Sequence, residues 1–294
     1  MDNNKIINGK EISNQILEEV KAETEVLKDS YATTPGLAFI IVGDNPASKV
    51  YVSSKAKACE KLGFYSVTES LPENVSEAEL LELIDRFNKD KYVHGILVQL
   101  PLPKHIDEQK VIESIDYKKD VDGFHPQNIG RLVIGTDCFI PCTPYGITEL
   151  LRRTNTETSG KNVVVLGRSN IVGKPIANLM VQKEFNSTVT ICHSATKNLN
   201  EITASADILI AAIGKADFVK KDMIKEGCVI IDVGINRVED KTAKNGSRIT
   251  GDVDYNDCFD KCAKITPVPG GVGPMTIAML MKNTLKSAKN TLNQ

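Results

Sequence analysis

The chain has 294 residues, of which 36 are basic and 38 acidic, so its formal net charge at pH 7 is −2. This length is sufficient for one large or two ordinary domains with a buried core. The balanced charge, without a basic stripe, excludes nucleic acid as an expected partner.

Secretion, membrane insertion and metal binding are not expected either. The N-terminal residues are polar and lack the apolar core of a signal peptide. Apolar runs such as residues 37–43 and 208–214 are too short to span a bilayer and predict buried strands. The seven cysteines and four histidines lack zinc-site spacing. We therefore expect reduced thiols, no metal, no membrane contact and a cytoplasmic location.

The first half of the chain alternates short apolar runs with amphipathic stretches, which predicts parallel strands joined by helices. The predicted elements are a helix over 11–28, a strand over 36–43, a helix over 44–63, a strand over 64–71, a helix over 76–90, a strand over 93–103 and a helix near 106–115. Ser76 and Glu79 are spaced as a capping box. Residues 116–130 are expected to form a loop.

The second half repeats this alternation and predicts a second lobe. Its elements are a helix from about residue 144, a turn over 156–162, strands over 162–167, 188–196, 206–214 and 227–236, a helix over 173–185 and a final long helix after a Gly/Pro turn. The boundary between the lobes is expected within residues 144–160. The fold class is therefore α/β, with an N-terminal α/β domain, a Rossmann-type domain and a cleft between them.

A strand, a glycine turn and a helix start follow one another in "VVVLGRSNIVGKP", residues 163–175. This order places a pyrophosphate at a helix N-terminus. The spacing from Gly167 to Gly173 differs from the G-x-G-x-x-G fingerprint, so glycines that serve only the turn geometry remain an alternative.

The end of the next strand, "CHSATK", favours NADP as the cofactor. An NAD site usually has an acidic residue there to hold the ribose 2′-hydroxyl. This strand instead ends in His193 and Ser194, and Arg168 can add a bidentate phosphate contact. An ordinary polar turn is the alternative.

Lys55 is unusual because it falls on the apolar arc of its helix, with Val52, Cys59 and Leu62. One interpretation is a lysine whose stem packs and whose amine reaches water. The other is a partly desolvated amine held beside the Tyr51 phenol for chemistry. A Tyr-x-x-x-Lys pair also occurs in short-chain dehydrogenases, but there the glycine loop precedes the pair, which is the reverse of the order here.

Several longer motifs carry a specific resemblance over essentially the whole chain. They are "YVSSK" (51–55), "GILVQLPLP" (95–103), "KDVDGFHPQNIG" (119–130), "PCTPYGI" (141–147), "VVVLGRSNIVGKP" (163–175), "CHSAT", "IDVGIN", "GDVD" and "PVPGGVGPMTIAMLM" (267–281). With these motifs the chain resembles the bifunctional methylenetetrahydrofolate dehydrogenase/methenyltetrahydrofolate cyclohydrolases, the FolD family.

The resemblance implies roles for individual residues. It implies that Lys55 is the central catalytic group and that Gln99 lies beside it. It also implies that Asp122 binds the pterin and that Tyr51 lines the same cleft. The other implied substrate-binding residues are Ser48, Leu100, Pro269, Gly270 and Gly271. The implied cofactor-binding residues are Gly167, Arg168, Ser169, Gly173, His193, Ser194 and Ile235.

The resemblance also implies the chemistry and the organisation. Methylenetetrahydrofolate would be oxidised with NADP to a methenyl cation, which is then hydrolysed to 10-formyltetrahydrofolate for one-carbon metabolism in purine and amino-acid biosynthesis. The N-terminal domain would comprise residues 1–143 plus 275–294, the Rossmann domain residues 144–274, and the assembly a homodimer.

Three alternatives remain at this point. The chain could keep only the dehydrogenase activity, because family members vary in cyclohydrolase competence. It could instead be a shikimate or amino-acid dehydrogenase-like enzyme, which needs a different polar constellation for a carboxylate substrate. A non-enzymatic NADP-sensing module would need no buried lysine.

Overall fold

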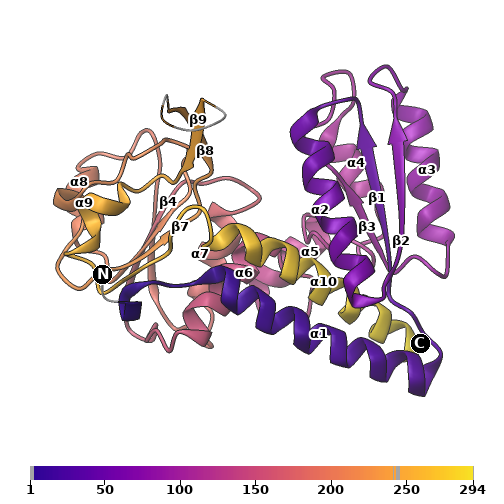
Figure 1. The fold of residues 1–294 in the computed structure, drawn as a ribbon, viewed down its shortest axis with the longest axis horizontal. Coiled ribbons are helices and arrows are strands. Elements are labelled where there is room, and N and C mark those ends of the chain that lie inside the picture. The colour runs from indigo at the N-terminus through magenta and orange to yellow at the C-terminus, as the bar shows by residue number, and fades with distance from the viewer. Residues whose placement is uncertain (1–2, 241, 243–245, 294) are drawn as a thin grey trace. The chain divides into compact units, whose positions relative to one another are not determined.

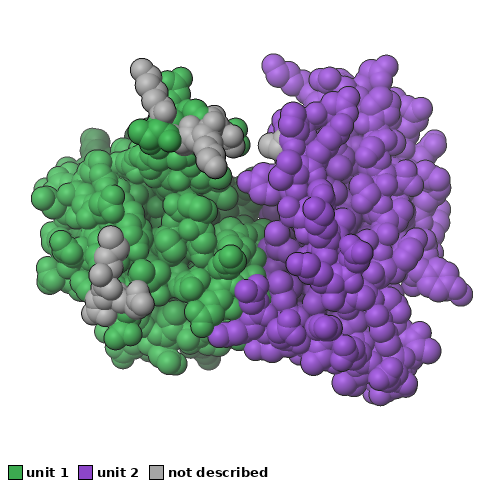
Figure 2. All heavy atoms as spheres, viewed as in Figure 1, with its two compact units in different colours: residues 1–13, 143–276 green, residues 14–142, 277–294 purple. Residues whose placement is uncertain are grey.

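The structure is a computed structural model that describes residues 3–240, 242 and 246–293. Its contacts divide the chain into two compact units, which Figure 2 colours separately. Unit 1 consists of residues 1–13 and 143–276, and unit 2 of residues 14–142 and 277–294. Helices α1 (Gly9–Tyr31) and α10 (Val272–Asn290) contribute residues to both units.

Unit 2 is built on a parallel three-stranded sheet. Its strands are β1 (Gly36–Val42), β2 (Tyr65–Leu71) and β3 (Gly95–Val98), in the order β2-β1-β3. Every residue of β1 is buried, as expected for a parallel strand that is covered on both faces.

Helices α2 (Pro46–Leu62) and α3 (Glu77–Lys89) flank this sheet on opposite sides (Figure 1). The core on the α3 side contains Ala38, Ile40, Leu80, Ile84 and Phe87. The predicted capping box of Ser76 and Glu79 is confirmed at the start of α3. Two shorter helices, α4 (Glu108–Ser114) and α5 (Pro126–Ile134), follow β3 in the chain.

Unit 1 contains a parallel five-stranded sheet in the order β10-β7-β6-β4-β5. The strands are β4 (Asn162–Leu166), β5 (Thr188–Cys192), β6 (Ile208–Ala211), β7 (Val229–Asp232) and β10 (Lys264–Ile265). The chain runs from β4 outward to β5 and then returns to the other side of β4 as β6. Doubly wound sheets bind ligands at such a switch point, outside the carboxyl ends of the strands.

The remaining elements complete the two units. They are helices α6 (Cys142–Arg153), α7 (Gly173–Met180), α8 (Leu199–Ala204) and α9 (Tyr255–Phe259), the antiparallel hairpin β8 (Asn236–Glu239) and β9 (Ser247–Thr250), and the 3₁₀ turns η1 (Asn3–Lys5), η2 (Lys221–Met223) and η3 (Thr291–Asn293). The α/β fold class with parallel sheets is thus confirmed.

Several predicted boundaries were wrong. The expected loop over 116–130 gives way to α5, because Pro126 starts that helix and the His125 side chain accepts a hydrogen bond from the N–H of Gln127. The strand predicted over 93–103 ends at Val98, and the helix predicted over 173–185 ends at Met180.

By their contacts, residues 3–13 group with unit 1. The N–H of Ile7 donates to the carbonyl oxygen of Ile265 at 2.9 Å, and Ile6 forms a bridge to the same residue. Ile6 and Ile7 therefore lie along the edge of the larger sheet, next to β10. None of the helices in the described part of the chain is both long and apolar enough to cross a bilayer.

Candidate active site

The apolar arc of α2 faces inward as predicted. Val52, Cys59 and Leu62 are all buried, whereas Lys57 is exposed. Lys55 lies on this arc and is half-buried. Its Nζ donates to Oε1 of Gln99 at 3.2 Å, so the amine is directed at a specific partner and not only at solvent.

Gln99 follows the last residue of β3, at the carboxyl end of the sheet. Its own N–H donates to the carbonyl oxygen of Ile40, and its Nε2 donates to the carbonyl oxygen of Leu100 at 2.7 Å. With Nε2 committed in this way, Oε1 is oriented toward the amine of Lys55. The backbone thus fixes the amide that positions the lysine.

Asp122 is the third member of this group. Burial raises the pKa of its carboxyl group, while the Lys55 charge and the Cys142 thiol act in the opposite direction. The loop that carries it is held on both sides of Asp122. Asn283 donates from Nδ2 to the carbonyl oxygen of Val121 at 2.8 Å, and Gly123 has a φ of +76° at a point where a Cβ would lie 2.6 Å from the nitrogen of Pro141.

The remaining predicted folate residues of unit 2 surround this group with different exposures. Tyr51 precedes Lys55 by one helical turn and is 48% exposed, so its ring has a free face. Ser48, one turn further toward the N-terminus, is buried. Leu100 is half-buried and contributes its carbonyl oxygen to the orientation of Gln99. The structure therefore brings Lys55 and Gln99 into contact, and it places Asp122 close enough to Lys55 for the lysine charge to lower the pKa of the carboxyl group.

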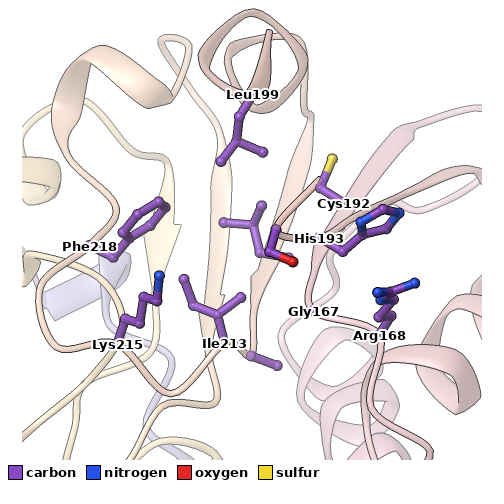
Figure 3. Close-up of a pocket in the computed structure, with 11 residues that line it drawn as sticks. Gly167, Arg168, Cys192, His193, Leu199, Ile213, Lys215 and Phe218 are labelled. Atoms are coloured by element: carbon purple, nitrogen blue, oxygen red, sulfur yellow. The ribbon is translucent and has the colours of Figure 1, made fainter. Parts of the chain in front are cut away.

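Unit 1 contains a cavity of about 300 Å³ at the carboxyl ends of β4, β5 and β6. Figure 3 shows Arg168 and His193 on one side of it and Lys215 and Phe218 on the other. The lining residues are Leu166, Gly167, Arg168, Cys192, His193, Ser194, Leu199, Ala212, Ile213, Lys215 and Phe218. This is the switch point at which a doubly wound sheet takes a nucleotide.

Two glycines allow the backbone to close tightly here. Gly167 has a φ of +114°, and a Cβ on it would lie 2.1 Å from the carbonyl oxygen of Ala212. A Cβ on Gly173 would lie 2.3 Å from the carbonyl oxygen of Gly167. Ser169 orders the turn between them, since its Oγ accepts from the N–H groups of Val172 and Gly173. The glycines are therefore sterically required.

The charges around this cavity suit a 2′-phosphate. None of the described residues that line it is acidic. Arg168 is exposed and has no hydrogen-bond or ion-pair partner among the described residues, and Ser194 is also exposed. The N–H of Ala195 donates to Nδ1 of His193 at 3.3 Å, which orients the imidazole. The predicted residues Gly167, Arg168, His193 and Ser194 thus lie together, and they fit NADP.

Six predicted residues lie in unit 1 but outside this lining: Ser169 and Gly173 of the glycine turn, and Ile235, Pro269, Gly270 and Gly271. Ile235 is 53% exposed and lies 3.9 Å from the position that a Cβ on Gly273 would take. Pro269, Gly270 and Gly271 form a turn that packs on residues 9–10: the N–H of Lys10 donates to the carbonyl oxygen of Gly270. Gly270 has a φ of +109°, which favours glycine.

Comparison with known proteins decides the family. Residues 7–122 match the tetrahydrofolate dehydrogenase/cyclohydrolase catalytic domain, and residues 141–292 match the NAD(P)-binding domain of the same family. The chain belongs to the tetrahydrofolate dehydrogenase/cyclohydrolase family.

Relatives of this family match over nearly the full length. The chain is 60% identical to the bifunctional protein FolD of Chlorobium luteolum, covering 96% of this chain and 97% of that one. The crystal structure of the bifunctional FolD enzyme from Campylobacter jejuni is 49% identical, with a TM-score of 0.92 over 97% and 99% of the two chains. The Trypanosoma brucei FolD, solved with NADP cofactor and an inhibitor, has a TM-score of 0.93 at 39% identity over 98% of each chain.

Two buried aspartates of the family's NAD(P)-binding domain were missed as site residues. Asp252 is fully buried and accepts hydrogen bonds from the backbone N–H groups of Ile213, Gly214 and Lys215 at 2.6–3.0 Å. Since Ile213 and Lys215 line the cavity of unit 1, Asp252 holds one of its walls. Asp252 belongs to the motif "GDVD" that the sequence analysis singled out, but the N–H groups that it binds lie almost forty residues away in sequence, so the motif did not reveal its role.

Asp232 supports Asp252 in turn. Its carboxylate accepts from the N–H groups of Gly234, Asp252 and Val253 at 2.9–3.0 Å. Burial outweighs these three donors and raises the pKa of Asp232 to about 7.

This raised pKa predicts a pH dependence of stability. The folded chain retains a proton on Asp232 that the unfolded chain releases near pH 4, so this group lowers the free energy of unfolding as pH rises from about 4 to about 7. Three pKa units correspond to roughly 4 kcal/mol. Urea unfolding of wild type and Asp232→Asn at pH 5 and pH 8 measures this, and the variant is expected to lose less stability between the two. Equal losses would contradict the assignment.

Within the described residues, no group of three or more His, Cys, Asp or Glu side chains is arranged to hold a metal ion.

Proposed function

We infer that the protein is a bifunctional folate enzyme. It oxidises 5,10-methylenetetrahydrofolate to 5,10-methenyltetrahydrofolate with NADP and hydrolyses the product to 10-formyltetrahydrofolate. The observation that carries this conclusion is membership of the dehydrogenase/cyclohydrolase family across both matched domains. Family membership also decides against a shikimate or amino-acid dehydrogenase and against a non-enzymatic NADP sensor.

The cofactor is NADP, which supplies the acceptor for the hydride when bound. Gly167 and Gly173 let the backbone approach the pyrophosphate at the start of α7. Arg168 and Ser194 bind the 2′-phosphate, and the oriented imidazole of His193 adds a polar contact. The turn over 269–271, with Ile235 nearby, presents backbone and apolar surface that suits planar ligands.

In the cyclohydrolase step, water adds to the methenyl carbon and loses a proton. The bond between that carbon and N5 then breaks and N5 takes up a proton, which leaves the formyl group on N10. Lys55 carries the proton that the water loses, because its amine is half-buried and aimed by Gln99. Asp122 accepts N–H bonds from the aminopyrimidinone edge of the pterin. The exposed ring of Tyr51 stacks on the ligand and shields the amine from bulk water, with Ser48 and Leu100 completing the contact surface.

A coupled spectroscopic assay tests this function. Purified protein is given methylenetetrahydrofolate with NADP or NAD, and both NADPH formation and methenyl absorbance are followed. The expected result is NADP-dependent reduction with transient methenyl absorbance that decays to the formyl product. Persistent methenyl absorbance would favour the dehydrogenase-only alternative, and absence of nucleotide reduction would overturn the proposal.

Arg168 provides a test of cofactor choice. Arg168→Gln is expected to raise KM for NADP by about 10- to 100-fold, because a charge-assisted phosphate contact is worth about 1.5–3 kcal/mol. KM for NAD should remain unchanged, since NAD lacks the 2′-phosphate. Lys183→Gln, an exposed lysine in the same unit, serves as the control for net charge. Equal losses with both nucleotides would show that Arg168 does not read the 2′-phosphate.

We further propose that the protein is a cytoplasmic homodimer with residues 1–143 and 275–294 as the folate domain and 144–274 as the NADP domain. The basis is the family resemblance, the balanced charge of −2 and the long helix α10, which belongs to unit 2 from Ile277 onward. Sedimentation of the purified protein tests the dimer, and a monomer at micromolar concentration would contradict it.

A further inference from the structure

A second cavity, of about 390 Å³, lies entirely within unit 2 and shares no lining residue with the groups assigned above. Its lining comes from His94, α5, the loops on either side of α5, and the C-terminal end of α10 with Thr291. His94 precedes β3 and Gln99 follows it, so about 17 Å of strand separates this cavity from the catalytic group. It is therefore distinct from the folate site, and its volume suits a small metabolite.

His94 directs a hydrogen-bond donor into this cavity. The residue is only 6% exposed, and its Nδ1 accepts from the N–H of Gly36 at 3.0 Å, so the neutral ring carries its proton on Nε2. Burial, with the Lys119 charge, lowers the pKa of His94, which keeps the ring neutral at pH 7. Nε2 has no hydrogen-bond partner among the described residues. Because every fully buried side-chain nitrogen among these residues does have a partner, Nε2 is not fully buried, and we infer that it opens into the cavity that His94 lines.

The cationic lining is only partly neutralised. Lys286 pairs with Asp137, and Lys119 donates to the carbonyl oxygens of Phe87 and Asp90. Lys118 and Arg131 have no side-chain partner among the described residues.

Asp116 is the other carboxylate of the lining, and its Oδ1 accepts from the backbone N–H of Lys118 at 2.9 Å. Four cations thus face two carboxylates. The lining side chains therefore carry a formal net charge of +2, with the guanidinium of Arg131 and the N–H of His94 as available donors. The nearby Asp120 carboxylate is held by Asn128.

We propose that this cavity is a binding site for a small dianion, either a phosphate monoester or a dicarboxylate. The guanidinium of Arg131 supplies the bidentate contact, Lys118 the second charge and Nε2–H of His94 the directional bond. Ser287 holds the backbone of two of these residues together, because its Oγ donates to the carbonyl oxygens of both His94 and Lys118 at 2.6–2.9 Å.

The test uses the full chain saturated with NADP, so that the phosphate contacts of unit 1 are filled. Inorganic phosphate and succinate are titrated separately by calorimetry, while imidazole nitrogen signals are followed by NMR. We expect saturable binding of one anion per chain and a shift of the His94 Nε2 signal. The signal of His105, whose Nε2 is bonded to the carbonyl oxygen of Val75, should not move.

Variants separate this site from general charge effects. Arg131→Gln should weaken binding at least tenfold and Lys118→Gln several-fold, whereas Lys21→Gln, an exposed lysine of α1, should bind as wild type does. Tighter phosphate binding assigns a phosphate monoester, and tighter succinate binding assigns a dicarboxylate. Absence of saturable binding by both anions, or wild-type affinity in a folded Arg131→Gln, would overturn the proposal.

Discussion

Replacing Lys55 with methionine is expected to lower cyclohydrolase turnover by about 10²- to 10⁴-fold, the contribution of a positioned proton carrier. Methionine keeps the length of the stem, so the packing of α2 is preserved while the amine that contacts Gln99 is lost. The dehydrogenase step moves a hydride and no proton to water, so it should retain much more activity. Methenyl absorbance should then accumulate in the coupled assay.

Lys57→Met is the matched control for this variant. Lys57 lies two residues further along α2 and is exposed, so its loss should leave both activities unchanged. Full cyclohydrolase turnover by Lys55→Met would show that the lysine does not carry the proton. A parallel fall of both activities, with unchanged thermal stability, would instead indicate that Lys55 binds the folate without a specific part in hydrolysis.

Asp252→Asn is expected to damage the NADP site without touching the cofactor. The carboxylate of Asp252 holds three successive backbone N–H groups of the 213–215 segment and the Nδ2 of Asn236. An amide in its place turns an NH₂ group toward these donors, which should cost about 3 kcal/mol. We expect a lower melting temperature and a Kd for NADP at least tenfold higher, measured by thermal unfolding and by calorimetry.

Asp254→Asn provides the comparison. Asp254 caps α9 and forms an exposed ion pair with Lys220, and asparagine retains the capping oxygen, so the expected loss is below about 1 kcal/mol. Wild-type NADP affinity in Asp252→Asn would show that the 213–215 segment holds its conformation without the buried carboxylate. Destabilisation without any change in Kd would assign Asp252 to folding alone.

Local signals predicted most of the elements of this fold. Runs of buried residues such as β1 and β4 were recognisable because strands covered on both faces are apolar throughout. The capping box before α3 marked its start, since capping depends on residues only three apart. The α5 helix was missed because its start signal, proline after a histidine cap, was read as part of a loop.

For the candidate site, too, local sequence signals predicted some residues and missed others. Helical periodicity alone singled out Lys55, and the absence of an acidic residue after β5 alone indicated NADP. Periodicity and spacing did not supply the partners. Gln99, which is 44 residues from Lys55, was named only through the family resemblance, and Asp252, which is 37 to 39 residues from the N–H groups that it holds, was not named at all. Such contacts depend on strand order, which no local pattern encodes.

The sequence by itself determined the fold class, the nucleotide preference and the family, because each depends on periodicity or on motifs that are contiguous in the chain. Only the tertiary structure decided what aims the Lys55 amine, which carboxylates support the NADP cavity and that His94 opens into a second, cationic cavity. These are consequences of burial and of pairing between distant segments, and a chain acquires them only when its strands and helices have packed.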